Sequence, residues 1–95
     1  MTWLVLLRER AEQDLASACD WYDSRQSGLG KEFLDEVAAS LRTLESYPKR
    51  QHLYYRDFRR IIIRRFPYKI FYQIIGEKVI VFRILHARQD HGKQV

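Results

Sequence analysis

Two long segments of β-branched and aromatic residues restrict most strongly how this chain can fold. The first runs from Tyr68 to Ile75, the second from Val79 to Leu85, and Gly76-Glu77-Lys78 lies between them. Segments of this composition, separated by a short glycine-containing turn, are typical of a β-hairpin. The sequence therefore predicts two antiparallel strands near the C-terminus, against which the other elements must pack.

The remaining elements follow from the spacing of apolar residues. Residues 3–7 and residues 60–64 are short apolar runs that predict strands, and residues 52–55 predict an extended lead-in. Between these runs, apolar residues recur at helical spacing, first from Ala11 to Tyr22 and then from Phe33 to Leu44. A glycine-containing turn separates the two expected helices, and Pro48 cannot continue the second.

This order of elements predicts an α+β fold, β-α-α-β-β-β, with a helical hairpin packed on one face of a small antiparallel sheet. Each helix has a single apolar face, so we expect the pair to cover the sheet. The length of 95 residues is typical of one domain. We therefore expect a single domain over residues 1–95, with residues 89–95 as a flexible tail.

Composition excludes several classes of protein. Hydrophobic residues make up 46% of the chain, which is enough for a modest core, and no apolar run is long enough to span a membrane. The first residues lack the basic start and cleavage site of a signal peptide. Cys19 is the single cysteine, which excludes an internal disulfide. We expect a cytoplasmic protein that needs neither a cofactor nor a metal ion.

Charge is distributed unevenly along the chain. Residues 1–47 contain 5 Lys and Arg and 9 Asp and Glu, a net charge of −4, whereas residues 48–95 contain 12 and 3, a net charge of +9. A basic half favours an anionic partner, either a nucleic acid or an acidic protein segment. The alternative is that the helices are simply acidic and the sheet simply basic.

Strand alternation predicts which side chains meet the helices. One row is entirely apolar and is expected to face them: Tyr68, Ile70, Tyr72 and Ile74, with Ile80, Phe82 and Ile84. The opposite row contains Lys69, Gln73 and Arg83, which we expect on an open basic face together with Arg65. His86 ends the apolar row, where a hydrogen-bonded structural role is expected. Trp21 and Tyr22 are expected in the core.

Several motifs occur in a recognisable order along nearly the whole chain. They are Ala11-Glu12-Gln13-Asp14-Leu15, Trp21-Tyr22, Gly28-Leu29-Gly30-Lys31-Glu32-Phe33-Leu34, Arg59-Arg60, Phe66-Pro67-Tyr68-Lys69-Ile70-Phe71-Tyr72 and Leu85-His86-Ala87-Arg88-Gln89-Asp90. In this order and spacing, the chain resembles the RelE/ParE family of toxins from bacterial toxin–antitoxin pairs. The fold of that family is the β-α-α-β-β-β arrangement.

The resemblance implies a toxin that inhibits growth and is neutralised by a co-encoded antitoxin in a hetero-oligomer. Such antitoxins wrap an acidic, partly disordered segment around the toxin, and a segment of this kind folds on binding. We expect the antitoxin or the target to contact six basic residues: Arg59, Arg60, Arg65, Lys69, Arg83 and Arg88. We also expect His86 and Asp90 to fix the end of the last strand.

The resemblance leaves the target open. The ending Leu85-His86-Ala87-Arg88-Gln89-Asp90 looks more like the ParE-like branch, which inhibits DNA gyrase by binding, and this reading is favoured. The alternative is a RelE-like endoribonuclease that cuts mRNA in the ribosome. In that case His86, with Glu45 as a possible partner, would be the general acid or base, and Arg65 and Arg83 would bind the phosphate. A third possibility is a module that binds its antitoxin without retained toxicity.

Overall fold

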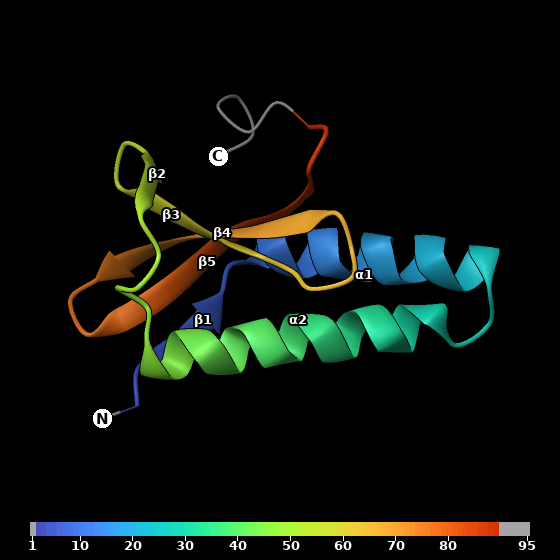
Figure 1. Cartoon of the computed structure of the whole chain (residues 1–95), viewed down its shortest axis with the longest axis horizontal. Helices are drawn as coiled ribbons and strands as arrows, with labels where there is room; N and C mark the ends of the chain where they lie inside the picture. The colour runs from blue at the N-terminus through green and yellow to red at the C-terminus, as the bar shows by residue number, and fades with distance from the viewer. Residues whose placement is uncertain (1, 90–95) are drawn as a thin grey trace.

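The computed structural model describes residues 2–89 and confirms the α+β architecture (Figure 1). The elements are β1 (Leu4–Leu7), α1 (Glu9–Arg25), α2 (Leu29–Ser46), β2 (Leu53–Tyr55), β3 (Phe58–Ile62), β4 (Tyr68–Ile75) and β5 (Lys78–His86). The extended lead-in is thus a strand of its own, β2. The prediction of a flexible tail over residues 89–95 falls on residues that, apart from Gln89, lie outside the described part of the chain.

The five strands form one sheet in the order β1-β5-β4-β3-β2. The β4–β5 hairpin predicted from the sequence lies at its centre, and β2, β3, β4 and β5 pair antiparallel. In contrast to the predicted antiparallel sheet, β1 pairs parallel to β5, with Leu4 opposite Lys78 and Leu7 opposite Val81. The chain can return beside β1 in this direction because both helices and three strands intervene.

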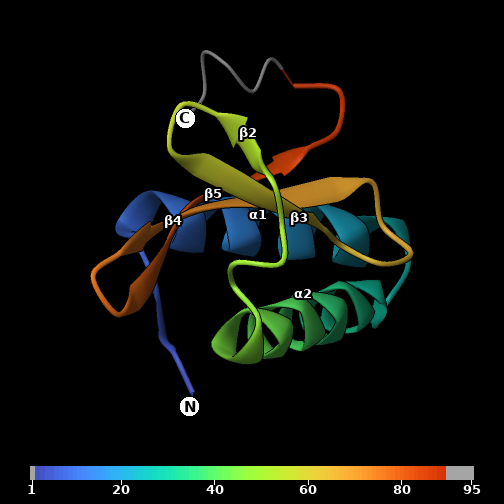
Figure 2. The same ribbon diagram turned by 60° about the vertical axis from the view of Figure 1, so that its left-hand side comes forward.

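Both helices pack on one face of the sheet and enclose the main core, as the two views of the ribbon show (Figures 1 and 2). The buried apolar residues of the helices follow the predicted helical spacing: Ala11, Ala18 and Tyr22 from α1, and Phe33, Val37 and Leu44 from α2. Strand β4 contributes Ile70 and Tyr72, with Tyr68 and Ile74 packed against them. The predicted face of β4 is therefore confirmed.

The predicted face of β5 is wrong at two positions because the strand contains a bulge. Phe71 pairs with Arg83 but its neighbour Tyr72 pairs with Val81, so Phe82 is an extra residue without an opposite partner. An extra residue shifts the alternation of the strand. Consequently Val79 and Val81, instead of Ile80 and Phe82, belong to the helix-facing core, together with Ile84.

The other face of the sheet has a smaller apolar cluster of its own. Phe58, Phe71 and Leu85 are buried but lie outside the helix-facing core. The ring of Phe58 meets that of Phe82 edge to face, with centroids 5.0 Å apart. This face is therefore more apolar than the open basic surface predicted from the sequence.

Trp21 also departs from its expected place. Its neighbour Tyr22 is buried and packs against Phe33 and Phe66, whereas Trp21 is 50% exposed with the Arg25 guanidinium over its ring. Adjacent helical residues point about 100° apart, so only one of them can face the core.

Gly30 sets the distance between the two helices. A Cβ atom at this position would lie 2.5 Å from the Cys19 carbonyl oxygen and 2.7 Å from Cγ of Asp23. The Gly30 N–H also donates to Asp23 Oδ1 at 2.8 Å. The start of α2 therefore packs directly on the backbone of α1.

Replacing Gly30 by alanine should force the helices apart. We expect Gly30→Ala to lower the free energy of unfolding by about 2 kcal/mol, the usual cost of overpacking a tight contact. Urea denaturation measures this change. Ser27→Ala, at a nearby exposed position, is the control and should change stability by less than about 0.5 kcal/mol. Equal stability of the two variants would contradict the close approach at Gly30.

Candidate interaction surface

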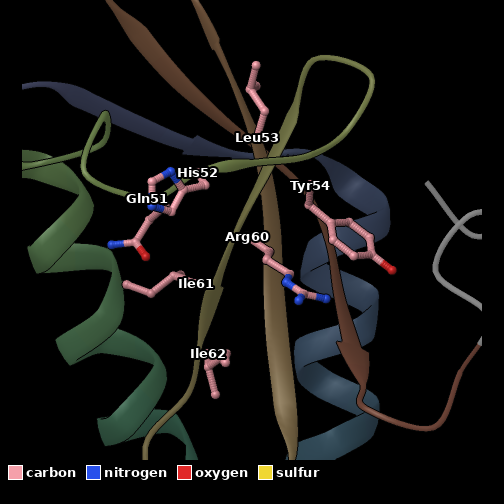
Figure 3. Close-up of a pocket in the computed structure, with 7 residues that line it drawn as sticks. All are labelled: Gln51, His52, Leu53, Tyr54, Arg60, Ile61 and Ile62. Atoms are coloured by element: carbon pink, nitrogen blue, oxygen red, sulfur yellow. The ribbon is translucent and has the colours of Figure 1, made fainter.

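A groove lies beside the outer strands of the sheet and is bordered by the connection from α2. It has a volume of about 420 Å³ and is lined by Gln51, His52, Leu53, Tyr54, Arg60, Ile61 and Ile62, which we call the β2–β3 groove (Figure 3). Figure 3 shows Arg60 and Tyr54 on one side of β3, and Gln51, His52 and Ile61 on the side of α2. The groove therefore combines apolar, aromatic and basic side chains.

Three hydrogen bonds from two side chains hold the connection that forms one wall of this groove. The guanidinium of Arg59 donates to the carbonyl oxygens of Lys49 and Gln51, and the hydroxyl of Tyr72 donates to the Pro48 carbonyl at 2.6 Å. Burial raises the pKa of Tyr72 to about 12, although nearby Arg59 opposes the shift. Arg59 thus fixes the connection that borders the groove. The binding role expected for Arg59 stays a prediction.

Arg60 and Lys69 supply positive charge on the side of the sheet away from the helices. The Arg60 guanidinium lies 3.9 Å from the centre of the Tyr54 ring, and that ring contacts Phe71. Partial burial lowers the pKa of Lys69, and the charge of Arg60 lowers it further. An anionic group that bound between Arg60 and Lys69 would relieve this repulsion.

Large apolar side chains are exposed at the rim of the groove. Ile62 is 64% exposed, Leu53 59% and Tyr54 43%. Exposed apolar residues that gather at one place, surrounded by polar groups, commonly mark an interaction site. The sequence reasoning missed these three residues, although the short β2 segment that contains two of them was recognised as extended.

The structure places Arg65 and Arg88 away from this groove. Arg65, with a positive φ of 73°, forms ion pairs with Glu32 at 2.8 Å and Glu36 at 3.6 Å on α2. Its expected place on an open sheet face is therefore wrong. Arg88 is exposed just after β5. Of the six basic residues predicted to bind a partner, Arg60 and Lys69 come together on the side of the sheet away from the helices, whereas the Arg59 guanidinium is held by the connection from α2.

Arg83 is buried, and its expected place on an open surface is wrong. Its guanidinium donates to both carboxylate oxygens of Asp14 on α1, at 2.7 and 2.9 Å. The same carboxylate accepts the backbone N–H of Ile84 at 3.0 Å. The Arg83 and Asp14 side chains are 10% and 13% exposed. The bulge at Phe82 lies directly before this ion pair, which joins α1 to β5.

His86 occupies the expected position at the end of the helix-facing row. It pairs with Tyr68 across β4 and β5, and their rings meet edge to face with centroids 5.2 Å apart. The Nδ1 atom of His86 accepts the backbone N–H of Arg88 at 3.1 Å. The backbone N–H of His86 donates to Gln89 Oε1 at 2.7 Å. These contacts end the strand in a turn. Asp90, which was predicted to help His86 fix the end of the last strand, lies outside the described residues.

Residues 2–89 contain neither a cluster of metal ligands nor a membrane-spanning helix. No group of three or more His, Cys, Asp or Glu side chains within this range could hold a metal ion. Neither α1 nor α2 is long and apolar enough to cross a membrane.

Comparisons with known proteins identify what the chain is similar to. The model of a family described as the ParE toxin of the type II toxin-antitoxin system parDE matches residues 5–91. No curated protein sequence matches the chain.

Three solved structures have a similar fold. One is the chromosomal ParDE toxin–antitoxin system from P. aeruginosa, with a TM-score of 0.80 and 13% identity over 90% of this chain and 96% of that one. The toxin–antitoxin complex RelBE2 from Mycobacterium tuberculosis has a TM-score of 0.66 and 20% identity over 90% and 99%. A free mutant of the E. coli toxin RelE has a TM-score of 0.69 and 22% identity over 98% and 92%.

The Asp14–Arg83 ion pair generates a prediction about stability. Asp14→Ala should lower the free energy of unfolding by about 3–5 kcal/mol, because it leaves the Arg83 charge buried without its partner. A double variant, Asp14→Leu with Arg83→Met, should recover much of that loss because it removes both charges. Urea denaturation of the set measures the coupling. If the double variant loses as much free energy of unfolding as Asp14→Leu and Arg83→Met lose together, a direct pairing is contradicted.

Tyr72 generates a prediction about pH. Because its pKa is raised above the ordinary value of about 10, the stability that it contributes is complete below pH 10 and is lost as the pH rises toward 12. In Tyr72→Phe, the fall of the unfolding free energy over this range should be flatter, by up to about 1.4 kcal/mol per pH unit. Tyr47→Phe, at an exposed ring, is the matched control. Identical pH profiles for wild type and Tyr72→Phe would rule out this contribution.

Proposed function

Because this chain belongs to the family of ParE toxins of type II toxin-antitoxin systems, we propose that it inhibits growth by binding DNA gyrase. A co-encoded antitoxin neutralises it by covering the binding surface. The toxin and antitoxin form a hetero-oligomer in the cytoplasm, where gyrase works.

The β2–β3 groove is the observation that carries this proposal. It presents exposed apolar side chains at Ile62 and Leu53 beside the guanidinium of Arg60. Aromatic and arginine side chains around an apolar centre are typical of surfaces that bind proteins. Arg59, Arg60 and Lys69 would contact acidic groups of the partner, and Arg88 would extend the contact beyond β5.

The surroundings of His86 support binding over catalysis. RNA cleavage requires a base for the 2′-hydroxyl, an acid for the leaving oxygen and a cation for the phosphate. His86 uses Nδ1 to accept the Arg88 N–H, and the Arg83 guanidinium is held by Asp14. Nδ1 of His86 is thereby occupied, and the Arg83 guanidinium is withheld from a phosphate while its ion pair persists, which favours binding over catalysis.

One observation favours mRNA cleavage as the alternative function. His86 is only partly buried and lies two residues from the exposed Arg88, so an acid–base group and a cation are close in the chain. In this alternative, the turn after β5 would open on the ribosome. A chain that binds its antitoxin without toxicity is the remaining alternative.

The first test follows both targets after brief expression of the protein in bacterial cells. We expect plasmid supercoiling to fall while mRNA remains intact over the same minutes. Rapid cleavage of mRNA with normal supercoiling would overturn the gyrase proposal in favour of the nuclease. If growth, supercoiling and mRNA are all unaffected by expression, the chain is not an active toxin.

The second test concerns His86. His86→Ala should remain toxic, because the proposed mechanism needs no proton transfer, although loss of the hydrogen bond to Nδ1 should cost about 1 kcal/mol of stability. His86→Asn, whose side-chain oxygen can replace Nδ1 as acceptor, is the structural control. A folded His86→Ala protein with no toxicity, beside an equally inactive His86→Asn, would point to catalysis.

A further inference from the structure

β1 forms one outer edge of the sheet, and alternate peptide groups along it point away from β5. The Arg8 N–H donates to the Val81 carbonyl at 3.0 Å, toward β5. Because peptide groups alternate in direction along a strand, the N–H and C=O of Leu6 also point to β5. Those of Val5 and Leu7 therefore point outward. Within residues 2–89, no strand pairs with this outer edge.

Helix α2 covers the start of the same edge. The Trp3 N–H donates to the Glu45 carbonyl near the end of α2 at 2.7 Å. Trp3 is thereby withdrawn from pairing with a further strand, which leaves the N–H and C=O groups of Val5 and Leu7 as the outward hydrogen-bonding positions of β1. A row of such groups at a sheet edge is a template for another strand.

The side chains of β1 are apolar on both faces, and two of them are exposed. Val5 and Leu7 pack against the helix-facing core, whereas Leu4 is 54% exposed and Leu6 is 42% exposed on the opposite face. The strand contains neither a charged residue nor a proline, with which natural proteins protect an edge. Leu6 lies beside Ile80 of β5, so a partner that covered Leu6 would extend an apolar row of the sheet.

Two copies of β1 satisfy these outward groups when they pair antiparallel with Leu6 on the two-fold axis. Val5 of each copy is then opposite Leu7 of the other, and each such pair exchanges two hydrogen bonds. The two Leu6 side chains meet in a non-hydrogen-bonded pair, where opposite side chains are closest. A register with Val5 on the axis would instead require the Trp3 N–H, which α2 already binds. The edge is thus complementary to itself, as a two-fold interface requires.

Charge around the edge also favours a second copy. Glu77, Lys78 and Leu4 line one cavity of about 440 Å³. In the two-fold pairing, Arg8 of the second copy lies opposite Leu4 and therefore approaches the side of the cavity that contains Glu77. At the other edge of the sheet, residues 49–65 contain seven Lys and Arg and one Asp, a net charge of +6, which opposes the pairing of two copies there.

We propose that the chain forms a homodimer through β1, in which the outward groups of Val5 and Leu7 join the two sheets into one. This inference does not depend on the proposed function. Because β2 forms the opposite edge of each sheet, the dimer leaves both β2–β3 grooves uncovered and carries them at its two ends. The dimer is therefore bivalent toward any partner of the groove.

Analytical ultracentrifugation of the purified full-length protein tests the association. We expect the mass to rise reversibly with concentration from that of one chain to that of two, because a paired edge of four residues is a small interface. A single chain at every concentration up to the solubility limit would overturn the proposal. Growth beyond two chains would also overturn it, because a two-fold pairing closes on itself.

Amide hydrogen exchange identifies the interface. At concentrations that form the dimer, exchange at the Val5 and Leu7 amides should slow severalfold relative to dilute protein, because these N–H groups gain partners. The Leu6 amide, which already points to β5, should change less. Concentration-dependent protection at residues 60–62 of β3, with none at Val5 and Leu7, would overturn the proposal and place the second copy at the other edge.

Cysteine crosslinking determines the register. In a Cys19→Ala background, Leu6→Cys should form a disulfide-linked dimer on oxidation with copper phenanthroline, because the two Leu6 positions are opposite each other. Leu4→Cys, at a more exposed position, is the control. Its two copies lie four positions apart along the paired strands, about 13 Å, which is too far for a disulfide. Equal crosslinking of the two variants would overturn the proposed pairing.

A matched pair of leucine variants separates the interface from general surface hydrophobicity. Leu6→Lys places two like charges at the axis and should weaken dimerisation at least about tenfold. Leu34→Lys, at a leucine of α2 that is 44% exposed, should leave dimerisation unchanged. Circular dichroism establishes that both variants fold. Equal dimerisation of the two variants would overturn the proposal, and if Leu6→Lys fails to fold, the exchange pattern of the native chain decides.

Discussion

The arrangement of helices and sheet depends on the hydrogen bonds that the Asp14 carboxylate accepts from β5. β1 pairs with β5 only as far as Val81, so the edge of β5 beyond that residue faces α1 rather than another strand. Asp14 accepts the Ile84 N–H at this edge and both donated bonds of Arg83. One side chain thereby satisfies an edge amide, pairs a buried charge and attaches α1 to the centre of the sheet.

The remaining packing follows from this attachment. Once α1 lies against β5, the close contact at Gly30 brings α2 alongside it, and both helices cover the same face. Within residues 2–89 no helix covers the opposite face, which buries a small cluster around Phe58 and Phe71. The short strand β2 leaves part of the β3 edge and its apolar rim accessible. The proposed interaction surface rests on these accessible apolar side chains.

Much of the fold could be predicted from the sequence because it depends on local patterns. Helical spacing identified α1 and α2, and the Gly76 turn between two apolar segments identified the β4–β5 hairpin. The helix-facing residues of β4 were predicted correctly because that strand has no extra residue between Tyr68 and Ile75. In contrast, the bulge at Phe82 has no sequence signal in an uninterrupted apolar run, and it reversed the assignment of Ile80.

The candidate site was harder to predict because its residues are positioned by distant partners. Arg83 was expected to be exposed, but it meets an aspartate 69 residues away, and Arg65 meets glutamates of α2. The net charge of the C-terminal half could not distinguish such internally paired arginines from available ones. Strand alternation did identify the position of His86 at the end of the helix-facing row.

The central claim is that the side of the sheet opposite the helices binds protein partners. Incorporation of p-benzoylphenylalanine at position 54, whose native tyrosine is 43% exposed in the β2–β3 groove, tests it directly in cells. Irradiation should crosslink the toxin to a gyrase subunit when it is expressed alone, and to the antitoxin when both are expressed. Crosslinks to these partners from a probe at position 42, on the exposed surface of α2, with none from position 54, would contradict the claim.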